Sequence, residues 1–245
     1  MTNIKLVIEY DGSAYAGWQK QKNALTIQEV LEDALCKVTG QAVALIGAGR
    51  TDSGVHAVGQ VANFHTLCRI PAEKYSYILN TMVPYDIRIR SSISVPDDFH
   101  ARFCVTGKRY VYSIYNHIHG TALYRNTFYH VRQTLDVPAM EKAAFYLLGT
   151  HDFKAFQAAG SPITNCVRTI NAAFFQADGY RIDFTIEGNG FLYHMVRIIM
   201  GTLLMIGKGK LAAQDMQKII ATQKREEAGP TVPSHGLCLS EVLYR

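Results

Sequence analysis

Apolar and polar residues follow the spacing of strands and helices in turn through the first hundred residues. Apolar side chains at alternate positions predict a strand over residues 4–11, which ends at the turn pair Asp11-Gly12. Over residues 26–38 the apolar residues recur at helical spacing, and Thr26 with Glu29 forms a capping box. The other elements expected here are strands over residues 42–46, 58–64 and 87–95 and a helix over residues 71–82.

The second part of the chain repeats this order of elements. We expect an aromatic strand over residues 106–116, a hairpin across Asp178-Gly179 and a closing strand over residues 236–244. The expected helices cover residues 137–148, 191–206 and 212–222, and the hairpin strands cover residues 169–177 and 181–188. Each half thus reads β-α-β-β-α-β. This order predicts an α+β fold of two ferredoxin-like or RRM-like halves, with antiparallel sheets and a cleft between them. We place the halves at residues 1–104 and 105–245.

Composition favours an intracellular globular protein. The 245 residues suffice for one large domain or two compact halves. Residues 1–10 lack the apolar region of a signal peptide, and the most apolar stretch, residues 191–206, is too short to span a bilayer. The five cysteines are scattered and never form a CxxC pair, which favours reduced thiols. We therefore expect a soluble cytoplasmic protein without a membrane segment.

The distribution of charge favours an RNA partner more than the net charge of +5 does. Residues 99–135 contain no Asp or Glu, but they contain five Arg or Lys, four His and eight aromatic residues. Cations bind phosphates and flat rings stack on bases, so this composition suits RNA binding. A pair of basic, aromatic-rich strands in an ordinary sheet would have the same composition.

A glycine-rich loop at residues 47–56 carries the first candidate for catalysis. Asp52 is the only acid between Asp33 and Glu73, and Arg50 and His56 flank it. Loops at strand ends commonly hold catalytic side chains, and the glycines allow another backbone to approach closely. A Thr-Asp-Ser-Gly turn in which the aspartate only bonds its own backbone is the structural alternative.

The apolar stretch of residues 191–206 carries the second candidate. A helix that is apolar on nearly all sides is expected to be buried, and Arg197 in its middle then needs a counter-ion. No acid occurs between Gly188 and Gln214, so Asp52 is a candidate partner that Arg197 would hold ionised. Alternatively Arg197 reaches solvent or pairs with Asp183 or Glu187. His194, three residues before Arg197, is expected on the same helical face.

Other kinds of site receive little support. The sequence has no HExxH metal motif, no GxSxG elbow for acyl transfer and no GxGxxG after the first strand.

Several segments, in order, resemble the TruA-type tRNA pseudouridine synthases, and the resemblance extends from Val7 to Tyr244. Ser53 departs from it, since we expect alanine there in most members. The matching segments are Tyr10-Asp-Gly-Ser-Ala-Tyr-Ala-Gly-Trp-Gln-Lys-Gln21, residues 26–32, Gly49-Arg-Thr-Asp-Ser-Gly-Val-His56, residues 97–103, Lys108-Arg-Tyr-Val-Tyr112, Gly149-Thr-His-Asp-Phe153 and His194-Met-Val-Arg197.

The resemblance implies a homodimer that converts uridine to pseudouridine in the tRNA anticodon stem-loop, at positions 38, 39 and 40, without metal or cofactor. It implies that Asp52 is the catalytic carboxylate and that Arg197 is the cation paired with it. Tyr110 would stack on the target uracil and assist removal of its C5 proton, and Arg50 would replace the flipped base. The residues expected to bind the substrate are Arg50, His56, Lys108, Arg109 and Tyr110.

Two other classes of protein remain as alternatives. A non-catalytic RNA-binding protein of two RRM-like halves would use Tyr110 and Tyr112 as a stacking pair, although the strand lacks the usual RRM motif. A metal-dependent hydrolase would use scattered His and Asp residues. The RNA-binding alternative leaves Asp52 and Arg197 unexplained, and activity that survives EDTA would exclude the hydrolase.

Overall fold

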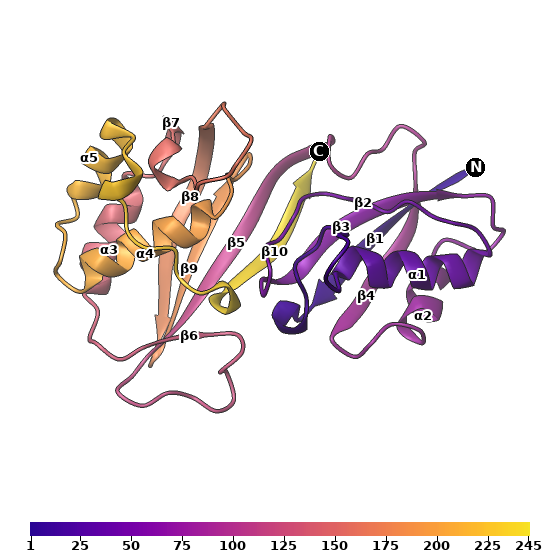
Figure 1. Cartoon of the computed structure of the whole chain (residues 1–245), viewed down its shortest axis with the longest axis horizontal. Helices are drawn as coiled ribbons and strands as arrows, with labels where there is room; N and C mark the ends of the chain where they lie inside the picture. The colour runs from indigo at the N-terminus through magenta and orange to yellow at the C-terminus, as the bar shows by residue number, and fades with distance from the viewer. The chain divides into compact units, whose positions relative to one another are not determined.

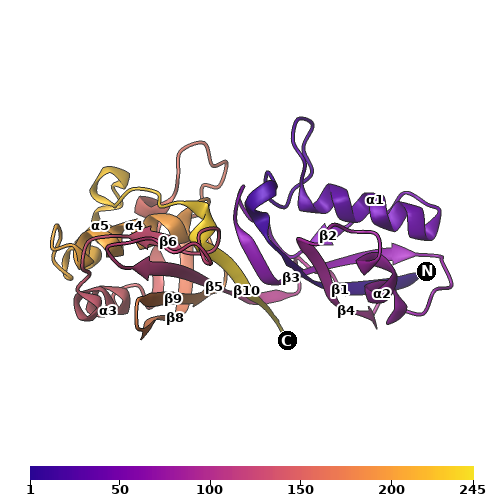
Figure 2. The same ribbon diagram turned by 90° about the horizontal axis from the view of Figure 1, so that it is seen from below.

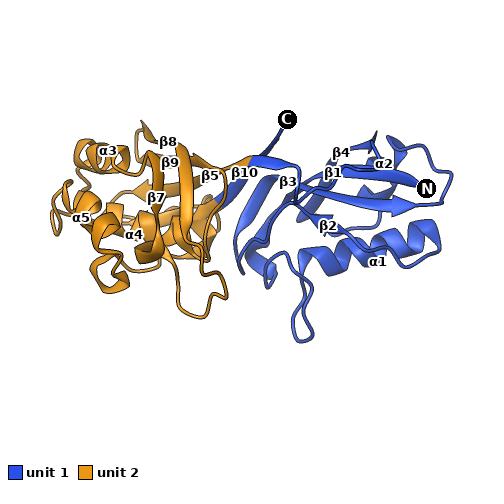
Figure 3. Ribbon diagram, turned by 90° about the horizontal axis from the view of Figure 1, so that it is seen from above, with its two compact units in different colours: residues 1–106, 238–245 blue, residues 107–237 orange.

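The computed structural model describes residues 1–245 and divides them into two compact units. Unit 1 comprises Met1–Thr106 and Cys238–Arg245, and unit 2 comprises Gly107–Leu237 (Figure 3). The last eight residues therefore belong to unit 1, whereas the sequence analysis assigned them to the second half. They belong there because β10 (Leu237–Tyr244) pairs in parallel with β3 (His56–Thr66), with Cys238 opposite His56.

Unit 1 contains a sheet in the order β4-β1-β3, with β2 and β10 both pairing with β3. β1 is antiparallel to β3 and to β4, and β2 is antiparallel to β3. Its first four strands are β1 (Thr2–Tyr10), β2 (Ile46–Gly47), β3 and β4 (Ile87–Val95), and its helices are α1 (Ile27–Thr39) and α2 (Lys74–Asn80).

One face of this sheet forms the core of unit 1. Alternate residues of β1, among them Leu6 and Ile8, are fully buried, as the pleat of a half-covered strand requires. The Tyr75 ring of α2 packs edge-to-face on Phe64 of β3 with ring centroids 5.3 Å apart. α1 contacts α2 and runs along the strands of this unit (Figure 2). Thr26 caps α1 through the Glu29 amide, as its capping box predicts.

The expected strand over residues 42–46 is almost absent, since only Ile46–Gly47 is a strand. The backbone groups of Leu45 bond to side chains of α1 instead of to a neighbouring strand. The Leu45 amide donates to the Glu32 carboxylate (3.1 Å), and the Leu45 carbonyl accepts from the Gln28 amide group (3.0 Å). A hydrophobicity pattern cannot show this, because it carries no information about long polar side chains on another element.

The strands of unit 2 follow the order β5-β9-β8-β7, with the short β6 parallel to β5 (Figure 1). The hairpin of β8 and β9 across Asp178-Gly179 is confirmed. β6 and β7 were not predicted. The elements of this unit are β5 (Val105–Asn116), β6 (Tyr129–Val131), α3 (Val137–Phe145), β7 (Gly149–Asp152), β8 (Val167–Asp178), β9 (Arg181–Gly188), α4 (Met195–Gly207) and α5 (Asp215–Thr222).

The buried helix α4 is confirmed, but it begins later than expected. His194 has a φ of 59°, in the left-handed region, so the right-handed helix can begin only at Met195. His194 therefore lies at the helix end and not on the face that carries Arg197. Thr202 in α4 accepts a hydrogen bond from the Gly229 amide (2.8 Å), and this contact fixes the segment that follows α5.

The architecture is a mixed α+β fold. None of its helices combines the length and the apolar character that a membrane-spanning helix needs.

Candidate active site

The loop that carries Asp52 lies between β2 and β3, and backbone hydrogen bonds join it to the segment that follows β1. The Trp18 amide donates to the Thr51 carbonyl (3.1 Å), and the Gly54 amide donates to the Tyr15 carbonyl (3.3 Å). Within the loop, the Val55 amide donates to the Asp52 carbonyl (3.1 Å) and closes a turn. The backbone on either side of Asp52 is thus held in place by residues 12–18.

Two glycines allow this close approach. A Cβ on Gly12 would lie 2.0 Å from the Val55 carbonyl oxygen. A Cβ on Gly17, whose φ is +90°, would lie 2.5 Å from the Thr51 carbonyl oxygen. Contacts between carbon and oxygen are rarely shorter than about 3.3 Å, so both positions exclude any side chain.

Polar side chains of β1 and β3 support the loop from within unit 1. The hydroxyls of Tyr10 and Thr51 share a hydrogen bond (2.8 Å), and the Gln60 side-chain amide donates to the Gly49 carbonyl (3.1 Å). Tyr10 is buried, and burial raises its pKa well above the ordinary value, so its hydroxyl stays neutral. Buried hydrogen bonds of this kind cost about 1–3 kcal/mol when one partner is lost.

His56, at the end of the same loop, is buried against the turn that follows β1. Its Nδ1 accepts a hydrogen bond from the Gly12 amide (3.1 Å) and lies 3.1 Å from the Asp11 carboxylate. Burial acts to raise the pKa of Asp11, but hydrogen bonds from Ser13 and the nearby His56 outweigh it, and the pKa is lowered overall. His56 thus connects the Asp52 loop to the Asp11-Gly12 turn.

The other two candidate residues of this loop are more accessible. Asp52 is half-buried and Arg50 is exposed. The Arg50 guanidinium donates through Nε to the Gln19 side-chain carbonyl (3.2 Å). Sequence reasoning did not single out Asp11 or Gln19. Both lie in the segment from Tyr10 to Gln21 that carries the family resemblance, and that position was the only available signal.

In unit 2, Tyr110 lies on β5 with its ring almost covered. It is 8% exposed, and it packs edge-to-face on Phe191 with centroids 5.2 Å apart. Tyr112, two residues further along the strand, is fully buried and donates to the Pro233 carbonyl (2.8 Å). Tyr112 is therefore part of the core, and the pair of exposed stacking rings that an RRM-like reading requires is absent.

Arg197 is half-buried in the first turn of α4. Its Nε donates to the Val232 carbonyl (2.8 Å), which fixes the position of the guanidinium. Two acids of β9 were considered as its partners. Glu187 forms an ion pair with Arg109 (2.7 Å), and the buried Oδ1 of Asp183 has no hydrogen-bond partner.

The strand β5 separates two of the expected substrate-binding residues. Successive side chains of a strand point to opposite faces, so Lys108 shares a face with Tyr110 whereas Arg109 does not. The pairing of Arg109 with Glu187, its register partner on β9, agrees with this alternation. Arg109 therefore lies on the opposite face of the sheet from the Tyr110 ring.

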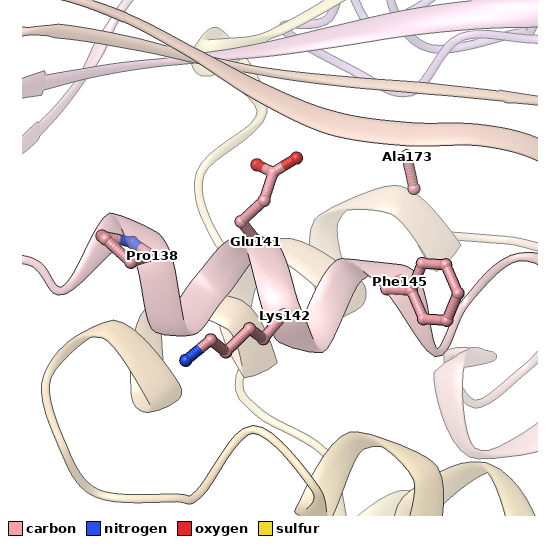
Figure 4. Close-up of a pocket in the computed structure, with 5 residues that line it drawn as sticks. All are labelled: Pro138, Glu141, Lys142, Phe145 and Ala173. Carbon is pink, nitrogen blue, oxygen red and sulfur yellow. The ribbon is translucent and has the colours of Figure 1, made fainter.

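Two further features lie apart from these residues. No group of three or more His, Cys, Asp or Glu side chains is arranged to hold a metal ion. A shallow hollow beside α3 is lined by Pro138, Glu141, Lys142, Phe145 and Ala173 (Figure 4). Glu141 points toward the neighbouring strand, where it accepts the Phe175 amide (2.9 Å), and Lys142 points away from it. None of the five is a candidate site residue.

Comparison with known proteins defines the class of this chain. The sequence model described as tRNA pseudouridine synthase matches residues 6–104 and 143–245. Two solved structures of Cbf5 complexes, one with Nop10 and Gar1 and one with Nop10, are 11% identical with TM-scores of 0.37 and 0.35. They cover 82% and 92% of this chain and 44% and 60% of theirs. The chain belongs to the tRNA pseudouridine synthase family, and it is an isomerase that acts on uridine in tRNA.

Relatives along the whole chain narrow the assignment to the TruA type. The chain is 52% identical to tRNA pseudouridine synthase A of Acetivibrio thermocellus over 244 residues. It is 49% identical to the enzyme of the same name from Ruminiclostridium cellulolyticum, and 48% identical to tRNA pseudouridine synthase A 2 of Clostridium perfringens. Each alignment covers 100% of both chains.

Proposed function

We propose that this enzyme converts uridines 38, 39 and 40 of the tRNA anticodon stem-loop to pseudouridine, with Asp52 as the catalytic carboxylate. The observation that supports it most is the fixed backbone around Asp52, which Gly12 and Gly17 contact at distances that exclude a side chain. A carboxylate that must meet one carbon of a flipped nucleotide gains rate from such positioning, because misplacement by about 1 Å can cost a hundredfold in rate.

The chemistry requires few groups. A uridine in a stem must first leave the stack, at a cost of a few kcal/mol. The Asp52 carboxylate then either attacks C1′ of the ribose or removes the 2′ proton, and the C1′–N1 bond breaks. The freed uracil rotates and bonds to C1′ through C5, which releases the Asp52 carboxylate from C1′ or is accompanied by return of the 2′ proton. C5 then loses its proton and N1 gains one. Substrate and product have the same atoms, so no external reactant is consumed.

The remaining roles rest on the surroundings of each residue within its own unit. We assign Arg50, an exposed cation held by Gln19, to replacing the flipped base. The uracil-stacking role of Tyr110 is proposed from the family resemblance, since its ring is 8% exposed and packs on Phe191, and Arg197 offers a guanidinium oriented by Val232. Lys108, on the same face of β5 as Tyr110, is suited to a phosphate. His56 and Arg109 are better suited to supporting roles, because the first is buried and the second is paired with Glu187.

Three broader expectations belong to the same proposal. In unit 1, β1 lies between β3 and β4, and β2 lies beyond β3, which supports a ferredoxin-like half. In unit 2 the first strand, β5, likewise pairs with β9, and β8 lies beyond β9, as β2 lies beyond β3 in unit 1. A homodimer and a cytoplasmic location are proposed from the resemblance to TruA-type enzymes.

The test is to incubate purified enzyme with unmodified tRNA transcripts and to map pseudouridine at each nucleotide. Asp52→Asn should bind tRNA with an affinity close to that of the wild type and form no pseudouridine. Asp33→Asn, which changes an exposed acid of α1, is the matched control and should keep full activity. Turnover by Asp52→Asn within tenfold of the wild type would reject the catalytic role, and modification only outside positions 38 to 40 would reject the target.

A further inference from the structure

Four aromatic side chains gather at the end of the unit 2 sheet, where β5 ends and β9 begins. The Tyr180 ring lies 4.3 Å from that of His117 and 6.1 Å from that of Tyr115, and His117 lies 5.6 Å from His119. We call Tyr115, His117, His119 and Tyr180 the ring surface. Tyr180 is 55% exposed, so much of it is accessible to a partner.

A cation adjoins the ring surface. Arg181 follows Tyr180 directly and lies opposite Tyr115 in the register of β5 and β9. Its guanidinium stacks on the rings of Tyr124 and Phe128, with centroid distances of 5.1 and 5.0 Å, and not on a carboxylate. This stacking holds the charge in place, and no ion pair joins it to an acid, although Asp178 lies opposite Arg181 in the register of β8 and β9.

The loop from β5 to β6 that frames the ring surface is tied to the sheet, and it extends past the end of β5 in Figure 1. The His130 ring bonds to the His117 carbonyl (2.8 Å), and the Asn116 side-chain amide donates to the Val131 carbonyl (2.8 Å). The backbone amide of Asn116 donates to the Tyr180 carbonyl (2.7 Å). Because the rings are held in advance, a partner that stacks on them has little ordering entropy to overcome.

The charge of this region selects the class of partner. Residues 117–133 contain Arg125 and Arg132 and no acid, and the acid nearest to Tyr180 in sequence is Asp178, the last residue of β8. Exposed rings beside cations that form no ion pair match unpaired bases and their phosphates. An acidic protein segment would satisfy the cations but not the exposed Tyr180 ring.

We propose that the ring surface is a second RNA-docking site, on which an unpaired base of the tRNA substrate stacks on Tyr180 while the adjoining phosphate meets Arg181. The proposal rests on the proposed function only for the identity of the RNA. The site contributes affinity for tRNA and takes no part in the isomerisation.

The experiment measures the Kd for unmodified tRNA and the rate of pseudouridine formation at saturating tRNA. Tyr180→Ala should raise Kd at least fivefold, because a stacked base contributes about 1–3 kcal/mol, which corresponds to fivefold or more. Its rate at saturating tRNA should equal that of the wild type. Tyr180→Phe keeps the ring and should stay within twofold of the wild-type Kd. Arg181→Gln should lower the slope of log K against log salt by about one, as the loss of one phosphate contact does.

The matched control is Tyr85→Ala. Tyr85 in unit 1 is also an exposed tyrosine beside an arginine, with Arg88 4.8 Å from its ring centre. The Tyr85→Ala variant should have a Kd for tRNA within twofold of the wild-type value. The proposal would be overturned by an unchanged Kd for Tyr180→Ala, or by an equal loss of tRNA affinity in Tyr85→Ala. A change of oligomeric state in Tyr180→Ala would also overturn it, because the surface would then be a contact between copies of the chain. Wild-type enzyme that forms no pseudouridine at positions 38 to 40 would instead count against the proposed function, whatever Tyr180 does.

Discussion

Replacing Gly12 with alanine tests whether the fixed backbone around Asp52 sets the rate of the enzyme. The new Cβ would lie 2.0 Å from the Val55 carbonyl oxygen and 2.7 Å from its carbon. Both atoms belong to the backbone, so no rotamer change relieves the contact. Carbon and oxygen approach to about 3.3 Å at the closest, so the two segments must separate by about 1.3 Å, only three residues from Asp52.

A displacement of about 1 Å at a catalytic group can lower the rate by about a hundredfold, or about 2.7 kcal/mol in activation free energy. The same overpacking should cost about 1–3 kcal/mol in unfolding free energy. We therefore expect Gly12→Ala to stay folded, to bind tRNA nearly as well as the wild type, and to turn over about a hundredfold more slowly. Single-turnover pseudouridine formation measures the rate, and urea denaturation measures the stability.

Gly40→Ala is the matched control. Gly40 ends α1 with a φ of +70°, but a Cβ there meets nothing within 4 Å. It should lose about 1 kcal/mol of stability and keep the wild-type rate. A rate for Gly12→Ala within twofold of that of Gly40→Ala, with both proteins folded, would show that the position of this loop does not limit catalysis.

Two further predictions follow from shifted pKa values. The lowered pKa of Asp11 stabilises the fold above the unfolded value of about 3.8 and ceases to do so as the pH falls through the folded value. Asp11→Asn should therefore cost up to about 1 kcal/mol in urea denaturation at pH 7, since this carboxylate is partly exposed. The loss should be smaller at pH 3, below the unfolded value, and equal losses at the two pH values would contradict the linkage. Burial raises the pKa of the Cys238 thiol to about 12. In the native protein a thiol reagent at pH 8 should therefore label the exposed Cys36 and Cys104 and leave Cys238 unlabelled until urea is added. Mass spectrometry of the labelled peptides measures this.

Sequence reasoning predicted elements well where local physics decides them. The capped helix α1, the Asp178-Gly179 hairpin and the buried α4 follow from spacing, capping and turn chemistry that act within a few residues. It missed the short strands β6 and β7, whose three and four residues carry no periodicity. It also placed the start of α4 four residues too early, because nothing in the sequence showed that His194 adopts a left-handed conformation.

The sequence by itself determined the family, the lone acid of the glycine-rich loop and the acid-free aromatic stretch, because these are properties of residue order. Only the tertiary structure decided which partner each polar group has. It buried His56 against Gly12, turned Arg109 toward Glu187 and away from the Tyr110 face, and assigned the last eight residues to unit 1. The physical reason is that such partners lie tens to more than a hundred positions apart along the chain, and short-range spacing contains no information about contacts at that separation.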